Sequence, residues 1–473
     1  MDDRRHLRLN PARSGPPRAV ACTAVPTRRA NWRTLRHPAQ YVAVAFMGAS
    51  LFGGLLLWLP FATEPGESTS FVTALFTATS AVCVTGLNVV DPASHWSTFG
   101  ELVILGLIQV GGFGIIALSS LLVAVLARRL GLRHRLIAVA ETGALDMSDV
   151  RRLLVNVAKL TLVVEVLGAV LLAGRFAATH GEPVPRAAYL GVFHSISAFN
   201  NAGFALFSDS LIGYQRDSYI LVVIAVAIII GGLGLPVWSQ LGRHRFRAHS
   251  WSLHAKLTVT TVVALILGGW ALFAWFEWTN PDTLGQLSAW ESTVNAFFHS
   301  VTPRTAGFNS VDIASMREPS RLLTEVLMFI GGGSASTAGG IKVTTFAVLG
   351  WVMWAEARGD PDVVVFERRV PQAAQRQALT VALLAIGMVI GSTMLLLATS
   401  PLGRADLMFE VISALATVGL SANITPLLSA TSQVVIIALM IIGRVGPITL
   451  FAALVLREHD RLYRHPEERP IIG

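Results

Sequence analysis

The chain has 473 residues, of which 53% are hydrophobic and only 14% are charged. Soluble domains carry about a quarter charged residues, so this composition excludes an ordinary water-soluble protein and indicates a membrane protein. The net charge of +8 comes from basic residues confined to short segments, so it does not indicate binding to nucleic acid. With only Cys22 and Cys83, the chain has no disulfide framework.

The N-terminal segment, residues 1–39, contains nine arginines and lacks an apolar core. This composition is typical of a disordered cytoplasmic tail rather than of a cleaved signal peptide.

The apolar residues that follow form blocks long enough to cross a bilayer. A hydrocarbon core about 30 Å thick requires roughly 20 residues of helix. The blocks are Tyr41–Phe61, Leu102–Leu126, Tyr219–Leu235 with its flanks, Leu257–Trp275, Ala378–Ala398 and Val434–Leu456. The lipid bilayer is therefore an expected partner. Tryptophans near the block ends are expected to be interfacial anchors, namely Trp58, Trp96, Trp275, Trp278 and Trp290.

Most of the 37 lysines and arginines lie in five segments. These are the residues before 41, Arg128–Lys159, Arg243–Lys256, Arg358–Arg376 and Arg457–Arg469. The intervening segments Thr63–Ser70 and Glu277–Glu291 contain acids and no base. The positive-inside rule places the five basic segments in the cytoplasm. We therefore predict a multi-pass protein of a bacterial inner membrane with both termini cytoplasmic.

Four shorter segments of about a dozen residues lie between the long blocks. They are Phe71–Val82, Ala187–Phe199, Ala289–Val301 and Ala405–Leu415. At about 1.5 Å per residue, none can cross the bilayer. We interpret them as re-entrant helices that enter and leave on the outer face. Surface helices are the alternative, but four matching positions favour the re-entrant interpretation.

The ends of these four segments resemble one another. The related strings are Ser80–Leu87, Ser197–Phe204, Val301–Phe308 and Ser413–Leu420. Each has a small residue, or valine in the third, six positions before a glycine, and leucine or phenylalanine directly after it. The glycines recur at a period of about 110 residues, which indicates an internal repeat.

Four converging strands of this kind predict a cation filter. Non-helical backbone at membrane depth is tolerated where it is buried or lines a watery path, and rings of carbonyls can replace the hydration shell of K+. The predicted K+ filter consists of Val84, Thr85, Gly86, Asn201, Ala202, Gly203, Thr305, Ala306, Gly307, Thr417, Val418 and Gly419. These strings contain no Asp or Glu, which suits a monovalent ion better than Ca2+.

We therefore predict an all-α polytopic membrane protein. Four tandem helix–re-entrant pore loop–helix repeats, with eight transmembrane spans, would surround a pseudo-four-fold pore. The predicted repeats are residues 40–127, 128–242, 243–357 and 358–473, the last including the C-terminal tail. Any single glycine is explained as well by helix packing, so the prediction depends on the four matched strings.

A glycine-rich segment interrupts the second span of the third repeat. It comprises Gly331, Gly332, Gly333, Ser334, Ala335, Ser336, Thr337, Ala338, Gly339 and Gly340, followed by Ile341 and Lys342. Five glycines in ten residues disfavour a helix. A phosphate-binding loop is disfavoured because Lys342 does not follow a glycine and no strand precedes it. We interpret the segment as an intramembrane gate, and a kink packed against a neighbour is the alternative.

Arg444 lies inside the apolar block Val434–Leu456. A charge at that depth is costly unless it is paired or hydrated, so Arg444 is a functional residue by hypothesis, and its assignment to the gate is what the family resemblance described below implies. Arg444 could obstruct cation passage or hold the loop in place, and Lys342 could share either role. No metal-binding His pair, nucleophile elbow or soluble domain supports an enzyme. The alternative function is a secondary transporter that moves another small solute by alternating access.

The chain resembles the Trk/Ktr/HKT superfamily of K+ transporters over residues 40–473. The resemblance rests on Val-Thr-Gly-Leu, Asn-Asn-Ala-Gly-Phe, Arg-Thr-Ala-Gly-Phe-Asn and Thr-Val-Gly-Leu-Ser in the four strings. It includes Ile108–Gly114, Gly331–Lys342 and Gly443–Thr449. Eight expected spans rather than ten favour the branch of the Ktr membrane subunits (KtrB).

The resemblance implies several further properties. A glycine at all four filter positions is associated with K+ selectivity, whereas serine in the first repeat marks Na+-preferring plant relatives. The loop at 331–342 is implied to be the gate, with Arg444 beside it. A homodimer on a cytoplasmic ring of nucleotide-binding regulatory subunits (KtrA-like, RCK) is also implied, with Glu467–Gly473 in dimer contacts. No cofactor is expected in this chain, and Na+ is a candidate coupling or activating ion.

Overall fold

The computed structural model describes residues 38–129, 147–244 and 248–456. The expected N-terminal tail, apart from its last two residues, lies outside this part of the chain, as does the expected dimer contact of Glu467–Gly473.

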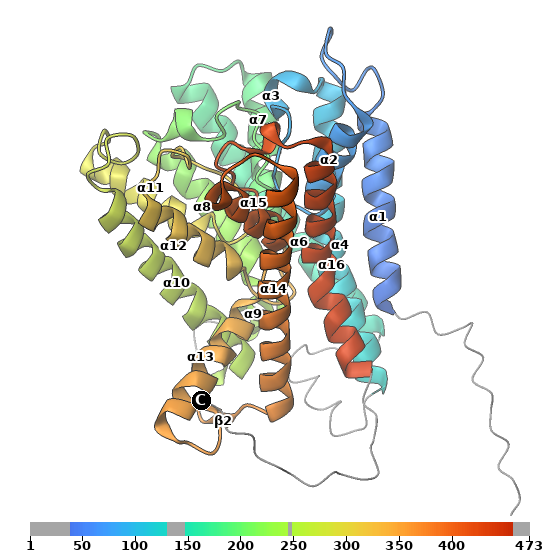
Figure 1. The fold of residues 1–473 in the computed structure, drawn as a ribbon, viewed down its shortest axis with the longest axis vertical. Helices are drawn as coiled ribbons and strands as arrows, with labels where there is room; N and C mark the ends of the chain where they lie inside the picture. Colours follow the sequence, from blue (N-terminus) through green and yellow to red (C-terminus); the bar gives the residue numbers. More distant parts are fainter. Residues whose placement is uncertain (1–37, 130–146, 245–247, 457–473) are drawn as a thin grey trace, which may run out of the picture. The chain divides into compact units, whose positions relative to one another are not determined.

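The described residues are mostly helical (Figure 1). The long helices are α1 (Pro38–Leu57), α4 (Thr98–Arg129), α6 (Met147–Thr179), α8 (Ser218–Leu233), α10 (Leu253–Glu277), α14 (Gln372–Thr399) and α16 (Ala430–Leu456). Four helices occupy the positions of the predicted re-entrant segments, and we call them the inner helices: α2 (Phe71–Val82), α7 (Val184–Asn200), α11 (Ala289–Val301) and α15 (Arg404–Ala416).

The remaining elements are further helices, 3-10 turns and two strands. They are α3 (Pro92–His95), α9 (Leu235–His244), α12 (Glu318–Phe329), α13 (Val343–Arg358) and the 3-10 turns η1 (Ile212–Tyr214), η2 (Ala248–Ser250) and η3 (Thr425–Leu427). Strands β1 (Val364–Val365) and β2 (Arg368–Arg369) form an antiparallel hairpin between α13 and α14, in which Val364 faces Arg369.

Local sequence signals explain where the inner helices begin. The side chain of Ser70 caps α2 by accepting from the backbone N–H of Thr73 at 3.1 Å. Ser288 and Glu291 form a capping box at the start of α11. Helix α7 has a proline in its first turn and α15 has Asp406 there, both of which suit a helix N-terminus.

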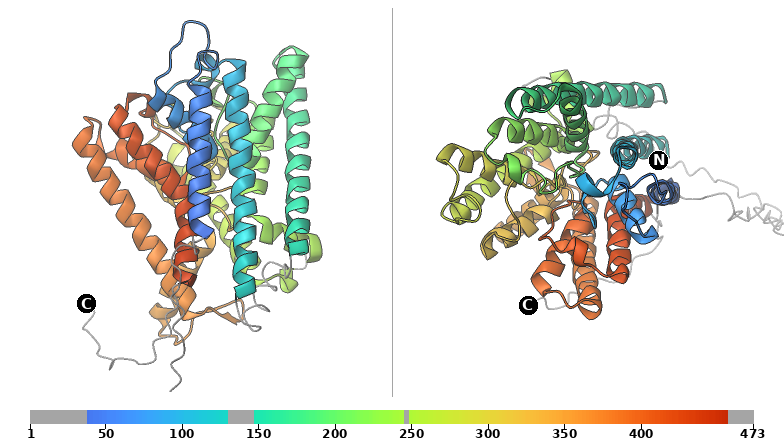
Figure 2. Two further views of the ribbon diagram at one scale, coloured as in Figure 1. Left: turned by 90° about the vertical axis from the view of Figure 1, so that its right-hand side faces the viewer. Right: turned by 90° about the horizontal axis from the view of Figure 1, so that it is seen from above.

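The inner helices are linked by a closed cycle of packing contacts. Each packs against the long helix that precedes it in the sequence: α1 with α2, α6 with α7, α10 with α11 and α14 with α15. Further contacts connect neighbouring inner helices through the helix between them: α4 with α7, α8 with α11, α12 with α15, and α16 back to α2. The view from above in Figure 2 shows these helix groups following one another around a common centre.

Several helices have the length and composition of membrane spans. By these two criteria alone, three helices of the described residues qualify: Val155–Thr179, Leu253–Glu277 and Gln372–Thr399. The bent pair Ser218–Leu233 and Pro236–Arg243 makes a fourth if it is one span. Shorter apolar helices cover Ala43–Leu57, Phe71–Val82, Thr98–Gly114 and Ala430–Gly446. Large apolar side chains on the long helices are exposed, including Leu162 at 62% and Leu383 at 59%. Such surfaces suit contact with lipid, as expected of a multi-pass membrane protein.

The predicted tryptophan anchors divide into two groups. Trp58, Trp275, Trp278 and Trp290 are exposed, as an interfacial position requires. The prediction was wrong for Trp96, which is only 1% exposed. A backbone bridge pairs Trp96 with Thr63 and His95 packs edge-on against the indole, so the ring is enclosed by its own loop.

Glu277, at the end of α10, anchors the start of α12. The side chain is fully buried. Its carboxylate accepts hydrogen bonds from Asn280 Nδ2 and Thr283 Oγ1, both at 2.6 Å, and from the N–H of Arg317 at 2.9 Å. The hydroxyl of Ser320 also donates to it. This one side chain therefore connects α10, the turn after it and the first turn of α12.

We expect Glu277→Ala to lower the free energy of unfolding by about 3 kcal/mol, because it leaves several buried donors unpaired. The matched control is Asp282→Ala, which removes an exposed carboxylate from the same turn. Thermal unfolding of the full chain in detergent measures both. Equal melting temperatures for the two variants would contradict the anchoring role.

Candidate functional site

The four glycines of the repeated strings lie in a closed ring. We call Val84–Gly86, Asn201–Gly203, Thr305–Gly307 and Thr417–Gly419 the ring segments. A Cβ built on each glycine would meet the carbonyl oxygen just before the next glycine: Gly86 with Ala202 at 2.5 Å, Gly203 with Ala306 at 2.9 Å, Gly307 with Val418 at 2.6 Å, and Gly419 in overlap with Thr85. All four glycines have positive φ, between 72° and 96°, so any side chain there would meet both strain and overlap.

Helices α2, α7 and α15 end in the same strained way. The first residue of the ring segment after each helix, Val84, Asn201 or Thr417, is left-handed with φ of 55°, 61° and 51°. Thr305, which begins the third ring segment, also has positive φ, 69°. In the fourth segment the N–H of Thr417 bonds to Ala414 O at 3.1 Å, and the next N–H bonds to Ser413 O at 2.8 Å. This is a Schellman motif, in which glycine is the usual left-handed residue. β-Branched residues there are unusual and indicate a conformation imposed by the surroundings.

A serine in the last turn of an inner helix fixes the first and fourth ring segments. Ser80 Oγ accepts from the N–H of Gly86, and Ser413 Oγ accepts from the N–H of Gly419, each at 3.0 Å. Each glycine is thus tied to the helix that precedes it.

In the second and third ring segments the helix hydroxyl donates a hydrogen bond instead of accepting one. Ser197 Oγ donates to the carbonyl of Phe204 at 2.8 Å, and Thr302 Oγ1 donates to that of Phe308 at 2.6 Å. In the third string a valine, Val301, stands at the position of these serines. Thr302, five residues before its glycine, has the role, because a valine side chain cannot hydrogen-bond.

Three hydroxyls of the ring segments are buried without a hydrogen-bond partner among the described residues. They belong to Thr85, Thr305 and Thr417. A buried hydroxyl without a partner costs about 1–3 kcal/mol.

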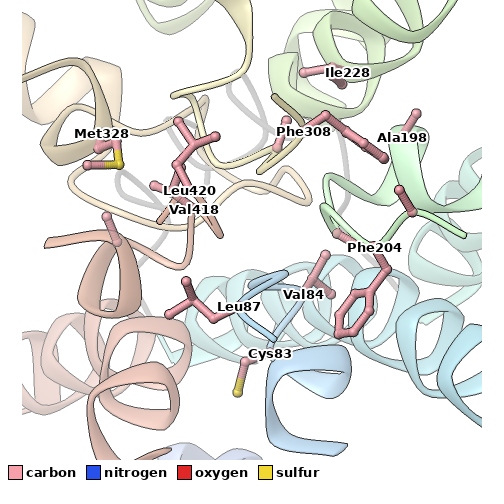
Figure 3. Close-up of a cluster of buried hydrophobic side chains, with 14 of the residues drawn as sticks. Cys83, Val84, Leu87, Ala198, Phe204, Ile228, Phe308, Met328, Val418 and Leu420 are labelled. Carbon is pink, nitrogen blue, oxygen red and sulfur yellow. The ribbon is translucent and has the colours of Figure 1, made fainter. Parts of the chain in front are cut away.

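Apolar side chains surround the ring segments. The residues directly after the glycines are Leu87, Phe204, Phe308 and Leu420, and all are almost fully buried. Figure 3 shows them coming from four separate segments to lie around a common centre. This shell keeps water away from the ring backbone, which strengthens electrostatic interactions there.

Glycines in the following helices allow close approach to the ends of the inner helices. A Cβ on Gly111 of α4 would overlap Val82 O, and one on Gly443 of α16 would overlap Leu415 O. Small residues commonly permit such close helix packing in membranes. The inner helices direct their C-terminal, partially negative ends at the ring segments.

The glycine-rich loop Gly331–Lys342 is not helical, as predicted. Its two ends are joined by a hydrogen bond from the N–H of Gly331 to Ile341 O at 2.9 Å. A Cβ on Gly339 would overlap Thr417 Oγ1, so the loop touches the fourth ring segment.

The opposite side of the loop contacts α7 and α8. The N–H of Gly333 donates to Gly232 O at 2.9 Å, and Thr337 Oγ1 donates to Phe199 O at 3.4 Å. The loop therefore lies against the C-terminal ends of both α7 and α15. The predicted gate residues between 331 and 340 all belong to this loop.

Two cationic side chains hold the loop. Arg444 is 3% exposed, and one of its terminal nitrogens donates to Thr337 O. Its Nε and its other terminal nitrogen have no hydrogen-bond partner among the described residues. Lys342 Nζ donates to Ala338 O at 2.6 Å. The structure thus brings both predicted gate cations onto carbonyls of the loop.

Most of the sequence matches a known family. The TrkH family model, described as a cation transport protein, covers residues 21–464. The chain belongs to this family. Its members are transport proteins rather than enzymes, and the superfamily expected from the four glycine strings is confirmed.

Similar proteins come from several bacteria. The potassium/sodium uptake protein NtpJ of Enterococcus hirae is 39% identical over 92% of this chain and 97% of its own length. The Ktr system potassium uptake protein B of Vibrio alginolyticus is 39% identical over 91% of this chain and 94% of its length. The corresponding protein of Bacillus subtilis is 37% identical over 92% of this chain and 97% of its length.

A solved structure shares the fold. The potassium transporter TrkH from Vibrio parahaemolyticus superimposes with a TM-score of 0.69, covering 91% of this chain and 86% of that one. The sequence identity is 19%, so this similarity concerns the helical architecture alone.

We expect Gly86→Ser to weaken discrimination between cations, because the added side chain must displace the carbonyl of Ala202. A loss of about 1.4 kcal/mol in relative binding changes the ratio of K+ to Na+ uptake about tenfold. The control is Gly66→Ser, since Gly66 has almost the same φ, 96°, but open space around it. Uptake of both ions into cells with equal amounts of each variant measures the ratio. The same ratio in both variants would contradict the assignment of the ring.

Proposed function

We propose that the chain is the membrane subunit of a K+ uptake system and that K+ passes through the ring of the four glycine segments. The closed ring is the observation that carries the proposal. Its backbone is not helical, is buried and is tied to four helix ends, as backbone at membrane depth must be. Carbonyl oxygens of four such segments can replace the water shell of K+.

The chemistry of the ring supports a monovalent cation. The ring segments contain no carboxylate side chain, whereas Ca2+ sites use several carboxylates. The partially negative ends of the inner helices add attraction for a cation without fixing it tightly.

We infer a membrane arrangement of four repeats with eight spans, in which the inner helices are re-entrant. The closed cycle of packing contacts and the short inner helices support it. The repeat boundaries remain those expected from the sequence. Because the basic segments alternate with the spans, both termini would lie in the cytoplasm and the protein in the bacterial inner membrane.

The names of the relatives support further proposals. Two are named as components of Ktr systems, which favours a homodimer that binds a cytoplasmic ring of nucleotide-binding regulatory subunits. One is named a potassium/sodium uptake protein, which makes Na+ a candidate coupling or activating ion here.

The loop Gly331–Lys342 is proposed as the gate. It contacts the ends of two inner helices and is held by Arg444 through a single carbonyl. A glycine-rich loop has several accessible backbone conformations, so it can move aside without unfolding a helix. In this proposal Arg444 both obstructs the path and keeps the loop across it.

Uptake in a bacterial strain that lacks its own K+ uptake systems tests the proposed function. We expect the chain, expressed with a cognate regulatory subunit, to restore growth at low K+. Failure to restore growth, with normal amounts of protein in the membrane, would favour a transporter of another solute that works by alternating access.

The gate is tested by deleting residues 334–339. We expect a higher basal K+ flux, because the deletion removes the part of the loop that touches the ring. Arg444→Ala should raise the flux in the same direction, whereas Arg444→Lys retains the charge and should keep it low. Flux into proteoliposomes measures all three. Reduced flux from a correctly folded deletion variant would show that the loop is only structural.

A further inference from the structure

Each inner helix carries a buried polar side chain at one shared position. This position lies three residues before the hydroxyl that holds the ring segment. The four side chains, with exposures of 1% or less, are Thr77, His194, His299 and Glu410. A phenylalanine precedes each one, and all four phenylalanines are almost fully buried: Phe76, Phe193, Phe298 and Phe409.

Two of these polar side chains do not reach the segments that follow the ring. Thr77 Oγ1 donates to Thr73 O in its own helix at 3.1 Å. His299 Nε2 lies 2.9 Å from Thr324 Oγ1 in α12. The first contact lies within helix α2, and the second joins α11 to α12.

His194 instead bonds to the segment after the second glycine. Its Nδ1 lies 2.8 Å from Leu190 O, and its Nε2 lies 3.2 Å from the backbone N–H of Leu206. Since a carbonyl can only accept, Nδ1 carries the proton and Nε2 accepts from Leu206. Stacking on Phe207, with ring centroids 4.7 Å apart, fixes the orientation of the imidazole. The chain three residues beyond Gly203 is thereby held to α7.

Glu410 makes the corresponding contact for the fourth glycine. Its Oε1 accepts from the hydroxyl of Thr425, which lies six residues after Gly419. Thr425 Oγ1 also lies 3.0 Å from Ser421 Oγ, so the bond ties the whole turn after the ring to α15. Glu410 Oε2 has no hydrogen-bond partner among the described residues, so the carboxylate is held through Oε1.

We propose that His194 and Glu410 are positioning residues that fix two opposite ring segments and thereby set the preference for K+ over Na+. Gly203 and Gly419 are not neighbours in the ring, because each lies between Gly86 and Gly307. In these two segments the start is fixed by a Schellman motif. In this proposal the carbonyl direction also depends on the other end, which these two side chains hold. This inference rests on the proposed function.

The test uses two isosteric changes that each remove one hydroxyl. Thr425→Val removes the partner of Glu410, and Thr324→Val removes the partner of His299 at the equivalent helix position. We expect Thr425→Val to lower the ratio of K+ to Na+ transport about tenfold, because an effect of this size corresponds to the loss of one buried hydrogen bond. Thr324→Val should leave the ratio unchanged, whatever it does to stability. Equal ratios in the two variants would overturn the proposal.

Substitutions at Glu410 and His194 give a second test on the full chain in proteoliposomes. Glu410→Gln retains an acceptor oxygen and should preserve the ratio, while Glu410→Leu and His194→Leu should lower it. A lowered ratio in Glu410→Gln would show that charge rather than the hydrogen bond matters, and would overturn the positioning role. If the unchanged chain transports no K+, the proposed function itself fails. If it transports K+ and all variants keep its ratio, only the positioning role fails.

Discussion

The lack of space between the four ring glycines is the constraint on which the rest of the structure depends. No Cβ fits at these positions without meeting a carbonyl of the next segment. Backbone this crowded must be held in place, because it cannot form helical hydrogen bonds of its own. Three features hold it. Residues Val84 and Thr417, which follow helices α2 and α15, adopt left-handed φ, and hydroxyls in the last turns of these helices bond to the ring segments. Glycines in the neighbouring helices allow close contact with the ends of α2 and α15.

The four units share this plan but are not equal. Helix α11 lacks the Schellman ending of the other three inner helices and uses Thr302 instead of a serine. The glycine-rich loop follows α12, and it reaches the ends of α7 and α15. A single chain can therefore differ in each quarter of a ring, and a loop in one quarter can contact two others. An assembly of four identical subunits could not do this without repeating the loop four times.

The local patterns in the sequence were sufficient to predict the inner helices, the ring glycines and the non-helical loop. These depend on residues close together in the chain, such as five glycines within residues 331–340. Sequence patterns were not sufficient to predict the role of Thr302. In the third string Val301 occupies the position of the serines, and the hydroxyl that bonds to the ring segment comes from the next residue. Burial of Trp96 and the contacts of His194 and Glu410 were also missed. Their partners are fixed by tertiary packing, which the spacing of residues along one string does not reveal.

Diffraction from crystals of the full chain soaked in Rb+, a heavier substitute for K+, would test the central claim most directly. We expect anomalous density on the axis of the ring, surrounded by carbonyl oxygens of all four ring segments, and its loss when Na+ replaces Rb+. Density confined to other parts of the protein, or equal occupancy of the ring in excess Na+, would contradict a K+ filter built from these four glycine segments.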